Sequence, residues 1–318
     1  MAVSAALLLP ACSLGSPYEN AADLPPTAPT TQPAEPIETP PPSVPPAEPT
    51  HEPAPGPSGG SDPGTPDESI EKLPDSVSIN GTGGSPDPTS AYTFMEAVIN
   101  DADRVWTEWM LGQGYMEPYV EWVIIRPDES YQAPDACAHD QDGVKSATYT
   151  SDFPNAFYCD VPNSTEQDKG ILVLPLNTFI RMWNGEIMGR FSDGAVGDFA
   201  AAAVVAHEFG HHIARELESQ MNHPHPTDKN KELLADCFAG VWSNTLWQAG
   251  GLADGDADEA MAALRAVGDD GTGPDPHGTP AERELAFRIG IAGYDTDPRG
   301  GVPAMCIDKY WAGFPGPR

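Results

Sequence analysis

The sequence has few basic residues and no long apolar run. Its 318 residues include 16 lysines and arginines against 48 aspartates and glutamates, which gives a net charge of −32. A chain this acidic repels phosphate backbones and anionic lipid surfaces, so we expect no nucleic-acid partner. No apolar run approaches the roughly 18 residues that a membrane-spanning helix needs. The acidity itself is typical of a solvated surface and does not indicate a fold.

Residues 13–88 are almost devoid of aromatic and basic side chains. This stretch holds 20 of the 36 prolines and 12 acidic residues, but only one aromatic residue, Tyr18, and one base, Lys72. Such a composition cannot bury enough apolar surface to offset the entropy lost on ordering. We therefore predict a disordered, proline-rich acidic tether over residues 12–88. The folded domain is predicted over residues 89–318, whose 230 residues suit a single domain.

The amino terminus is a short apolar run that ends in Leu9-Pro10-Ala11-Cys12. It resembles the end of a bacterial lipoprotein signal peptide, although the usual positively charged start is missing. The resemblance implies that residues 1–11 are a signal-peptide remnant and that Cys12 carries a lipid. The proline-rich stretch would then be a semi-extended spacer between the membrane and the domain. We accordingly expect an extracytoplasmic, lipid-anchored protein, or a secreted one if Cys12 is not lipidated.

Only four cysteines remain besides Cys12, namely Cys137, Cys159, Cys237 and Cys306. An even number in an exported domain predicts two disulfides, for which three connectivities exist. We favour Cys137–Cys159, which closes a short loop, together with Cys237–Cys306, which closes a long one. None of the four has Cys-x-x-Cys spacing, so a zinc site made of thiolates is not expected.

Helices are predicted at the start of the domain and throughout its second half. Two capping boxes mark helix starts, one formed by Thr93 and Glu96 and the other by Thr279 and Glu282. The other helices follow from apolar periodicity and from the absence of helix breakers. The predicted helices cover residues 93–112, 199–218, 229–248, 256–267 and 279–293.

Strands are predicted only in the first half of the domain. Residues 119–125 are rich in β-branched and aromatic side chains, which is typical of a strand. Residues 130–163 have the composition of a loop. Residues 171–176 form a short apolar run, and Pro175 suggests that this strand lies at the edge of a sheet. We therefore predict an α+β fold, in which a small N-terminal sheet is followed by a helical region.

The helix predicted over residues 199–218 contains His207-Glu208-Phe209-Gly210-His211. At a spacing of four, two imidazoles project from the same helix face and can share a metal ion. Glu208 can reach a water molecule on that metal without ligating the metal itself, which suits hydrolysis. The run just before this motif is wholly apolar, so the helix is predicted to be buried. Two histidines and a glutamate would be costly there unless they were paired or metal-bound.

A catalytic zinc ion takes three protein ligands, so this motif needs one more. His223 and His225, in a His-Pro-His-Pro stretch, are one pair of candidates. Glu232 is the better candidate, because Glu232 and Asp236 lie four residues apart on one face of an otherwise apolar helix. One of these carboxylates can ligate the metal, and the other can accept the free N–H of a ligating histidine.

Three motifs taken together resemble the neutral zinc metallopeptidases of bacteria. They are Val-Ala-His-Glu-Phe-Gly-His-His at 205–212, Glu-Leu-Leu-Ala-Asp-Cys-Phe-Ala-Gly-Val-Trp at 232–242 and His-Gly-Thr-Pro-Ala-Glu-Arg at 277–283. The resemblance extends over about residues 91–314, which is nearly the whole predicted domain. It implies a zincin-like fold in which a glutamate is the third zinc ligand.

Carried over to this sequence, the resemblance assigns a role to each residue of the motifs. It makes His207, His211 and Glu232 the zinc ligands and Glu208 the general base. It makes Asp236 the carboxylate that accepts the free N–H of a ligating histidine.

A histidine and an arginine lie six residues apart in the third motif. His277 and Arg283 resemble the histidine–arginine pair of the heat-shock and CAAX prenyl membrane proteases. That analogy implies that His277 stabilises the oxyanion of the tetrahedral intermediate. Arg283 is equally well explained as a structural ion-pair partner.

The sequence therefore predicts a zinc-dependent endopeptidase that is tethered to the cell surface. We expect it to act on a peptide or protein and to be monomeric. An edge strand, for which residues 171–176 are a candidate, could pair with an extended substrate. The alternative is a surface lipoprotein that binds zinc or a partner without turnover. Glu208 disfavours this alternative, since a purely structural zinc site would not need a base.

Overall fold

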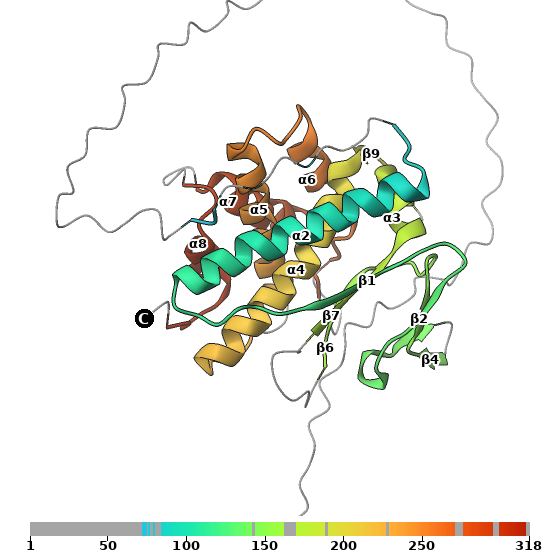
Figure 1. The fold of residues 1–318 in the computed structure, drawn as a ribbon. Coiled ribbons are helices and arrows are strands. Elements are labelled where there is room, and N and C mark those ends of the chain that lie inside the picture. Colours follow the sequence, from blue (N-terminus) through green and yellow to red (C-terminus); the bar gives the residue numbers. More distant parts are fainter. Residues whose placement is uncertain are drawn as a thin grey trace, which may run out of the picture. The chain divides into compact units, whose positions relative to one another are not determined.

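The protein is described from a computed structural model, shown in Figure 1. The described residues are 72–74, 76, 79, 84–141, 144–161, 170–187, 190–226, 229–270, 276–294 and 299–315, and of residues 190–195 only the backbone is described. The predicted signal-peptide remnant, Cys12 and the tether up to residue 71 lie outside these residues.

The main sheet has three strands, in the order β1-β7-β6. β1 (Glu121–Ile125) runs parallel to β7 (Gly170–Pro175), and β6 (Phe157–Asp160) runs antiparallel to β7. β7 is therefore the central strand, and all six of its residues are buried, so the prediction of an edge strand at 171–176 is wrong. Pro175 is the last residue of β7, and its missing N–H removes no donor from the interior of the ladder.

The segment predicted as a loop, residues 130–163, contains short strands instead. They are β2 (Ser130–Gln132), β3 (His139–Gln141), β4 (Val144–Ser146), β5 (Thr148–Thr150) and β6, with a 3₁₀ helix η1 (Asp135–Cys137) between β2 and β3. β2 pairs with β5 and β3 pairs with β4, both antiparallel. The paired strands β2 to β5 have three residues each, which is too short for an apolar alternation to be recognised in the sequence.

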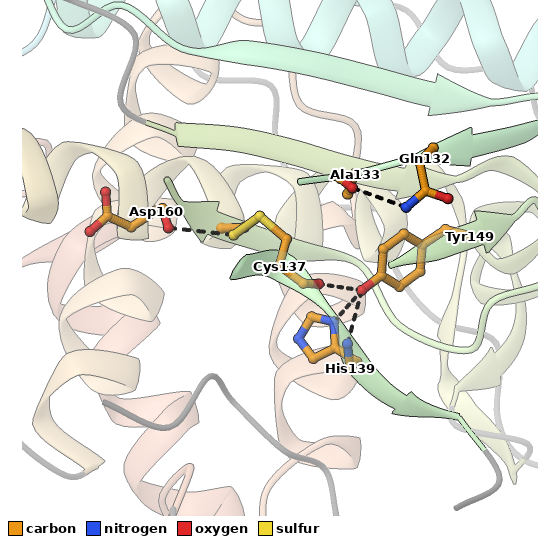
Figure 2. Close-up of a disulfide and its surroundings, with 7 residues drawn as sticks. Gln132, Ala133, Cys137, His139, Tyr149 and Asp160 are labelled. Carbon is orange, nitrogen blue, oxygen red and sulfur yellow. Dashed lines mark hydrogen bonds between the residues drawn. A yellow bond between two sulfur atoms is a disulfide. The ribbon is translucent and has the colours of Figure 1, made fainter. Parts of the chain in front are cut away.

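These short strands enclose a small apolar cluster that is separate from the main core. Its buried members are Ile125, Ala133, Cys137, Ala147, Tyr149, Phe157, Ile171 and Val173. The Cys137–Cys159 disulfide lies at this cluster and joins η1 to β6 (Figure 2). The second disulfide, Cys237–Cys306, lies in the main core, so the favoured pairing of the four cysteines is confirmed.

The helices predicted for the second half of the chain are present, and their ends agree within three residues. They are α4 (Asp198–Met221), α5 (Lys229–Gln248), α6 (Asp256–Ala266) and α7 (Pro280–Ala292). α7 begins with the predicted capping box of Thr279 and Glu282. The prediction missed α3 (Leu176–Trp183), α8 (Pro303–Tyr310) and a hairpin of β8 (Asn184–Ile187) and β9 (Arg190–Val196). None of the helices in the described part of the chain combines the length and apolar composition that a membrane span requires.

The first helix, α2 (Pro88–Gly112), begins earlier than predicted. Its N-cap is Asp87, whose side chain accepts hydrogen bonds from the backbone N–H groups of Thr89 and Ser90 at 2.9 and 3.1 Å. The predicted N-cap, Thr93, lies inside the helix, and its hydroxyl donates to the Thr89 carbonyl at 3.0 Å. Proline at the first helical position, preceded by an aspartate, favours the earlier start.

The end of the predicted tether packs against the domain. Leu73 is buried, and its backbone N–H donates to the Gly301 carbonyl at 3.3 Å. Ser76 is also buried; its hydroxyl donates to the Asp101 carboxylate at 2.5 Å and hydrogen-bonds with the Thr245 hydroxyl. The folded domain therefore includes residues ahead of the predicted boundary.

α5 lies inside the helical region, where it packs against α4, α7 and α8. In Figure 1, α4 (yellow) lies between this helical region and the sheet, and α2 (teal) packs across α4. Every residue of α5 from Glu232 to Leu246 is buried, so α5 has no solvated face over this length. The polar side chains of this stretch must therefore find partners within the protein.

Candidate metal centre

The two helices that carry the predicted ligands, α4 and α5, approach closely at Gly210. A Cβ atom added at Gly210 would lie 2.8 Å from the carbonyl oxygen of Ala235 and 3.0 Å from its Cα. Glycine inside a helix costs roughly 1 kcal/mol relative to alanine, and here it allows the two backbones to meet. The crossing places the histidine motif of α4 against the face of α5 that bears the two carboxylates.

The structure brings His207, His211 and Glu232 together into one group of potential metal ligands. The Nε2 atoms of the two histidines lie 3.1 Å apart. The Oε2 atom of Glu232 lies 3.4 Å from the Nε2 of His207 and 3.6 Å from the Nε2 of His211. Tetrahedral zinc, with bonds of about 2.0–2.2 Å, requires its ligand atoms to be about 3.4 Å apart. The three donor atoms therefore fit zinc in both chemistry and spacing.

His207 is oriented by a buried ion pair behind it. Its Nδ1 lies 2.8 Å from Oδ1 of Asp236. Arg283 binds the same carboxylate with both of its ends, from Nε to Oδ2 at 2.8 Å and from Nη2 to Oδ1 at 2.7 Å. The acceptor at Nδ1 places the proton of a neutral His207 there and leaves Nε2 as the ligand atom. Arg283 is therefore an ion-pair partner that fixes Asp236.

The electrostatics of the group favour a bound cation. Burial opposes protonation of His207, but the Asp236 carboxylate raises its pKa to about 10. Burial also opposes ionisation of Glu232, but His211 and His207 hold the pKa of Glu232 well below its ordinary value. The pKa of Asp236 is lowered in the same way, against burial, by Arg283 and His207. Both carboxylates thus stay ionised beside charged histidines, and a divalent cation that replaced the histidine protons would meet the same negative charge.

Glu208 lies next to the ligand group in the sequence without belonging to it. It is only 8% exposed, and its Oε2 accepts a hydrogen bond from the backbone N–H of Tyr158, in β6, at 2.7 Å. Burial raises the pKa of Glu208 above its ordinary value. A raised pKa makes a carboxylate a better proton acceptor near neutral pH, which suits a general base.

The other histidines of the region lie outside the ligand group. His223 and His225 pack against the ring of Trp311, at centroid distances of 6.0 and 5.8 Å, so the structure brings Glu232 rather than this pair to the two histidines of α4 that could ligate a metal. His277 is held by Asp269, whose Oδ2 accepts from the backbone N–H of His277 at 2.8 Å and lies 3.2 Å from its Nδ1.

A second group of acids could also be considered for a metal. Potential ligand atoms of Asp198, Asp256 and Glu259 lie within 4.8 Å of one another. Burial, followed by the charges of Asp256 and Asp198, raises the pKa of Glu259 to about 7. This group offers only carboxylates and has no histidine, so it lacks the nitrogen ligands that distinguish the group in α4 and α5.

Three contributors to the site were not found in the sequence. They are the backbone N–H of Tyr158, the close contact at Gly210 and the Asp269 carboxylate beside His277. Backbone N–H groups have no residue-type signature. Gly210 was part of the recognised motif, but only the crossing of the helices shows what it does.

Residues 74–291 match the model of a family described as "Putative neutral zinc metallopeptidase". Among curated relatives, the uncharacterized protein YpfJ of Escherichia coli K12 is 37% identical over 134 residues, which cover 36% of this chain and 44% of YpfJ. The uncharacterized proteins Mb2605 of Mycobacterium bovis and Rv2575 of Mycobacterium tuberculosis are each 35% identical over 136 residues, which cover 35% of this chain and 44% of each relative. The chain thus spans less than half the length of these relatives. No solved structure matches.

Proposed function

The chain belongs to the neutral zinc metallopeptidase family, and on this basis we propose that it hydrolyses internal peptide bonds with the help of a zinc ion held by His207, His211 and Glu232. The observation that carries the proposal is the spacing of three donor atoms, 3.1, 3.4 and 3.6 Å apart, beside a buried carboxylate that is not one of them. A structural zinc site has four protein ligands, whereas a catalytic site has three and keeps one position open.

The chemistry divides between the metal and two side chains. Zinc, when bound, supplies a Lewis acid that polarises the substrate carbonyl and lowers the pKa of water. Glu208 takes the proton of the attacking water and then delivers it to the leaving amine. In its imidazolium form, His277 would donate its Nε2–H to the substrate oxygen on which negative charge develops, while the Asp269 carboxylate, 3.2 Å from Nδ1, accepts its other N–H.

The substrate is proposed to bind along β6 as an extended chain. β7 cannot take this role, because it has β1 on one side and β6 on the other. β6 pairs with β7 along one edge, and the N–H of Tyr158 points from its other edge to Glu208. A peptide that binds extended along that edge, through backbone groups of β6 other than the Tyr158 N–H, would pass beside the base.

Metal analysis combined with a peptidase assay tests the proposed function. The wild-type protein is expected to keep about one zinc ion per chain after dialysis and to cleave an unstructured protein such as casein. Glu232→Ala is expected to lose the zinc and the activity, because it removes one of three ligands. His225→Ala serves as the matched control and is expected to keep both.

Two outcomes would contradict this expectation in different ways. A wild-type protein without stoichiometric zinc would overturn the proposal as a whole. A zinc-loaded protein that cleaves no peptide or protein would overturn only the catalytic half, and would favour a zinc-binding surface protein.

The domain is further proposed to be held at the cell surface by a lipid on Cys12. The run Leu9-Pro10-Ala11-Cys12 and the proline-rich stretch behind it support this proposal. When cells are fed a labelled fatty acid, the wild-type protein is expected to take up label and to fractionate with membranes. Cys12→Ser is expected to do neither. Equal labelling of the two proteins would place the lipid elsewhere.

A further inference from the structure

We infer that the Cys137–Cys159 disulfide positions the carboxylate of Glu208, because it fixes strand β6, whose Tyr158 N–H holds that carboxylate. This inference rests on the proposed function, since it treats Glu208 as the base. Cys137, Cys159 and Tyr158 are positioning residues in this scheme, and they act on the reaction through Glu208.

The first step is the contact between β6 and the base. The Tyr158 N–H donates to Oε2 of Glu208 at 2.7 Å, which is the short distance typical of a hydrogen bond to a charged acceptor. Within the described part of the chain, no other hydrogen bond to the Glu208 carboxylate is found. The direction in which this carboxylate points therefore depends on where the Tyr158 nitrogen lies.

The second step is the limited support that β6 receives from the sheet. β6 has four residues, and among the described strands it pairs only with β7. Tyr158 is opposite Leu172, and its N–H is directed away from β7 toward Glu208. In an antiparallel pair, such a residue makes no ladder bond itself and relies on its neighbours. The neighbour on the carboxyl-terminal side is Cys159.

The third step is the anchor at the other end of the disulfide. Cys137 is 1% exposed, and its carbonyl accepts a hydrogen bond from the hydroxyl of Tyr149, which is fully buried. The same hydroxyl accepts from the backbone N–H of His139 at 3.2 Å and lies 2.8 Å from the Nδ1 of that residue. Figure 2 shows these bonds converging on the Tyr149 oxygen. The disulfide thus ties β6 to a fixed point in the small apolar cluster.

The fourth step is the contrast between the two disulfides. Cys237 and Cys306 are both 0% exposed and join α5 to α8 within the main core. Their bond supports the domain as a whole. The cluster around Cys137 has only eight buried members. A covalent link there therefore contributes more to the position of one strand than a link in the main core does. The pair Cys237–Cys306 is therefore the matched control.

Amide hydrogen exchange tests the positioning without any need for activity. In the wild-type protein the Tyr158 amide is expected to be protected. In Cys137→Ser/Cys159→Ser it is expected to exchange about 10-fold faster or more, while amides in the middle of α4 keep their protection. In Cys237→Ser/Cys306→Ser, any change is expected to affect the whole domain rather than Tyr158 alone. An unprotected Tyr158 amide in the wild-type protein would overturn the inference.

Kinetics then test the consequence for the base. Tyr158→Pro removes the N–H donor, and Tyr158→Ala removes the ring but keeps the donor. Tyr158→Pro and Cys137→Ser/Cys159→Ser are expected to lower kcat by about 10- to 100-fold with full zinc content, because the base is displaced. Tyr158→Ala, which keeps the N–H donor, is expected to retain more activity than Tyr158→Pro. If Tyr158→Pro and Tyr158→Ala lose activity equally, or if the double variant keeps full kcat, the inference is wrong.

The two tests separate this inference from the proposed function. A wild-type protein that binds zinc and shows the expected exchange pattern, but cleaves nothing, would support the positioning of Glu208 and overturn only the hydrolysis. An active enzyme whose Tyr158 amide is unprotected would leave the proposed function standing and overturn the positioning.

Discussion

Glu208→Gln is expected to lower kcat/KM by about 10²–10⁴-fold without loss of zinc. The amide is close to the carboxylate in size, and its carbonyl oxygen can still accept the hydrogen bond from the Tyr158 N–H that Glu208 accepts at 2.7 Å. The glutamine amide, however, cannot accept a proton from water at neutral pH. The two histidines and Glu232 that would hold zinc are untouched, so the metal content reports whether the site is still assembled.

The measurement is the initial rate of cleavage as a function of substrate concentration, for zinc-loaded wild-type and variant proteins. Glu216→Gln is the matched control, because Glu216 is a buried glutamate of the same helix that lies outside the ligand group. It is expected to keep the wild-type rate. A Glu208→Gln protein that turns over normally would show that the base is a different group. Full complementation of a cellular phenotype by Glu208→Gln would favour the non-catalytic alternative.

Arg283→Met is expected to lower the free energy of unfolding by about 3 kcal/mol, at the lower end of the range for breaking one side of a buried ion pair. Asp236 is 0% exposed and Arg283 is 3% exposed. Without the guanidinium, the one hydrogen bond that the Asp236 carboxylate keeps within the described residues is that with His207 at 2.8 Å, and this remaining contact is why the lower end is expected. Burial raises the pKa of Asp236, and the charge that opposes this effect most strongly is that of Arg283.

Urea unfolding of the zinc-free protein measures this loss, since zinc would add a ligand-dependent contribution to stability. Arg288→Met, at an exposed position of the same helix, is the control and is expected to change stability by no more than about 0.5 kcal/mol. Equal losses for the two variants would mean that an apolar side chain at position 283 stabilises the protein as well as the ion pair does.

The parts of the site that could be predicted are those set by local helix geometry. His207 and His211 share a face because they are four residues apart in a helix, wherever that helix lies in the fold. The same rule places Glu232 and Asp236 together on α5. Thr279 and the residues after it form a capping box whose partners are all within three positions. Each of these features follows from spacing alone.

The parts that could not be predicted depend on contacts between distant segments. The central position of β7 follows from pairing with β1 and β6, which no local pattern encodes. Pro175 was misleading because a proline at the end of a strand and a proline at a sheet edge look alike in a sequence. Thr93 was misleading because Thr93 and Glu96 have the spacing of a capping box although they lie inside the helix. The helix begins earlier, with Asp87 as its N-cap and Pro88 as its first residue.

The contacts of Leu73 and Ser76 determine where a mechanical load would enter the domain. Tension carried by the chain ahead of residue 72 reaches the fold at Gly301, at Asp101 of α2 and at Thr245 of α5. Thr245 is nine residues from Asp236, or about 14 Å along the helix. The contacts with α2 and α5 thus receive a pull on the amino-terminal segment about two and a half helical turns from Asp236. A force on the amino-terminal segment is therefore expected to displace the domain without distorting the group of potential metal ligands.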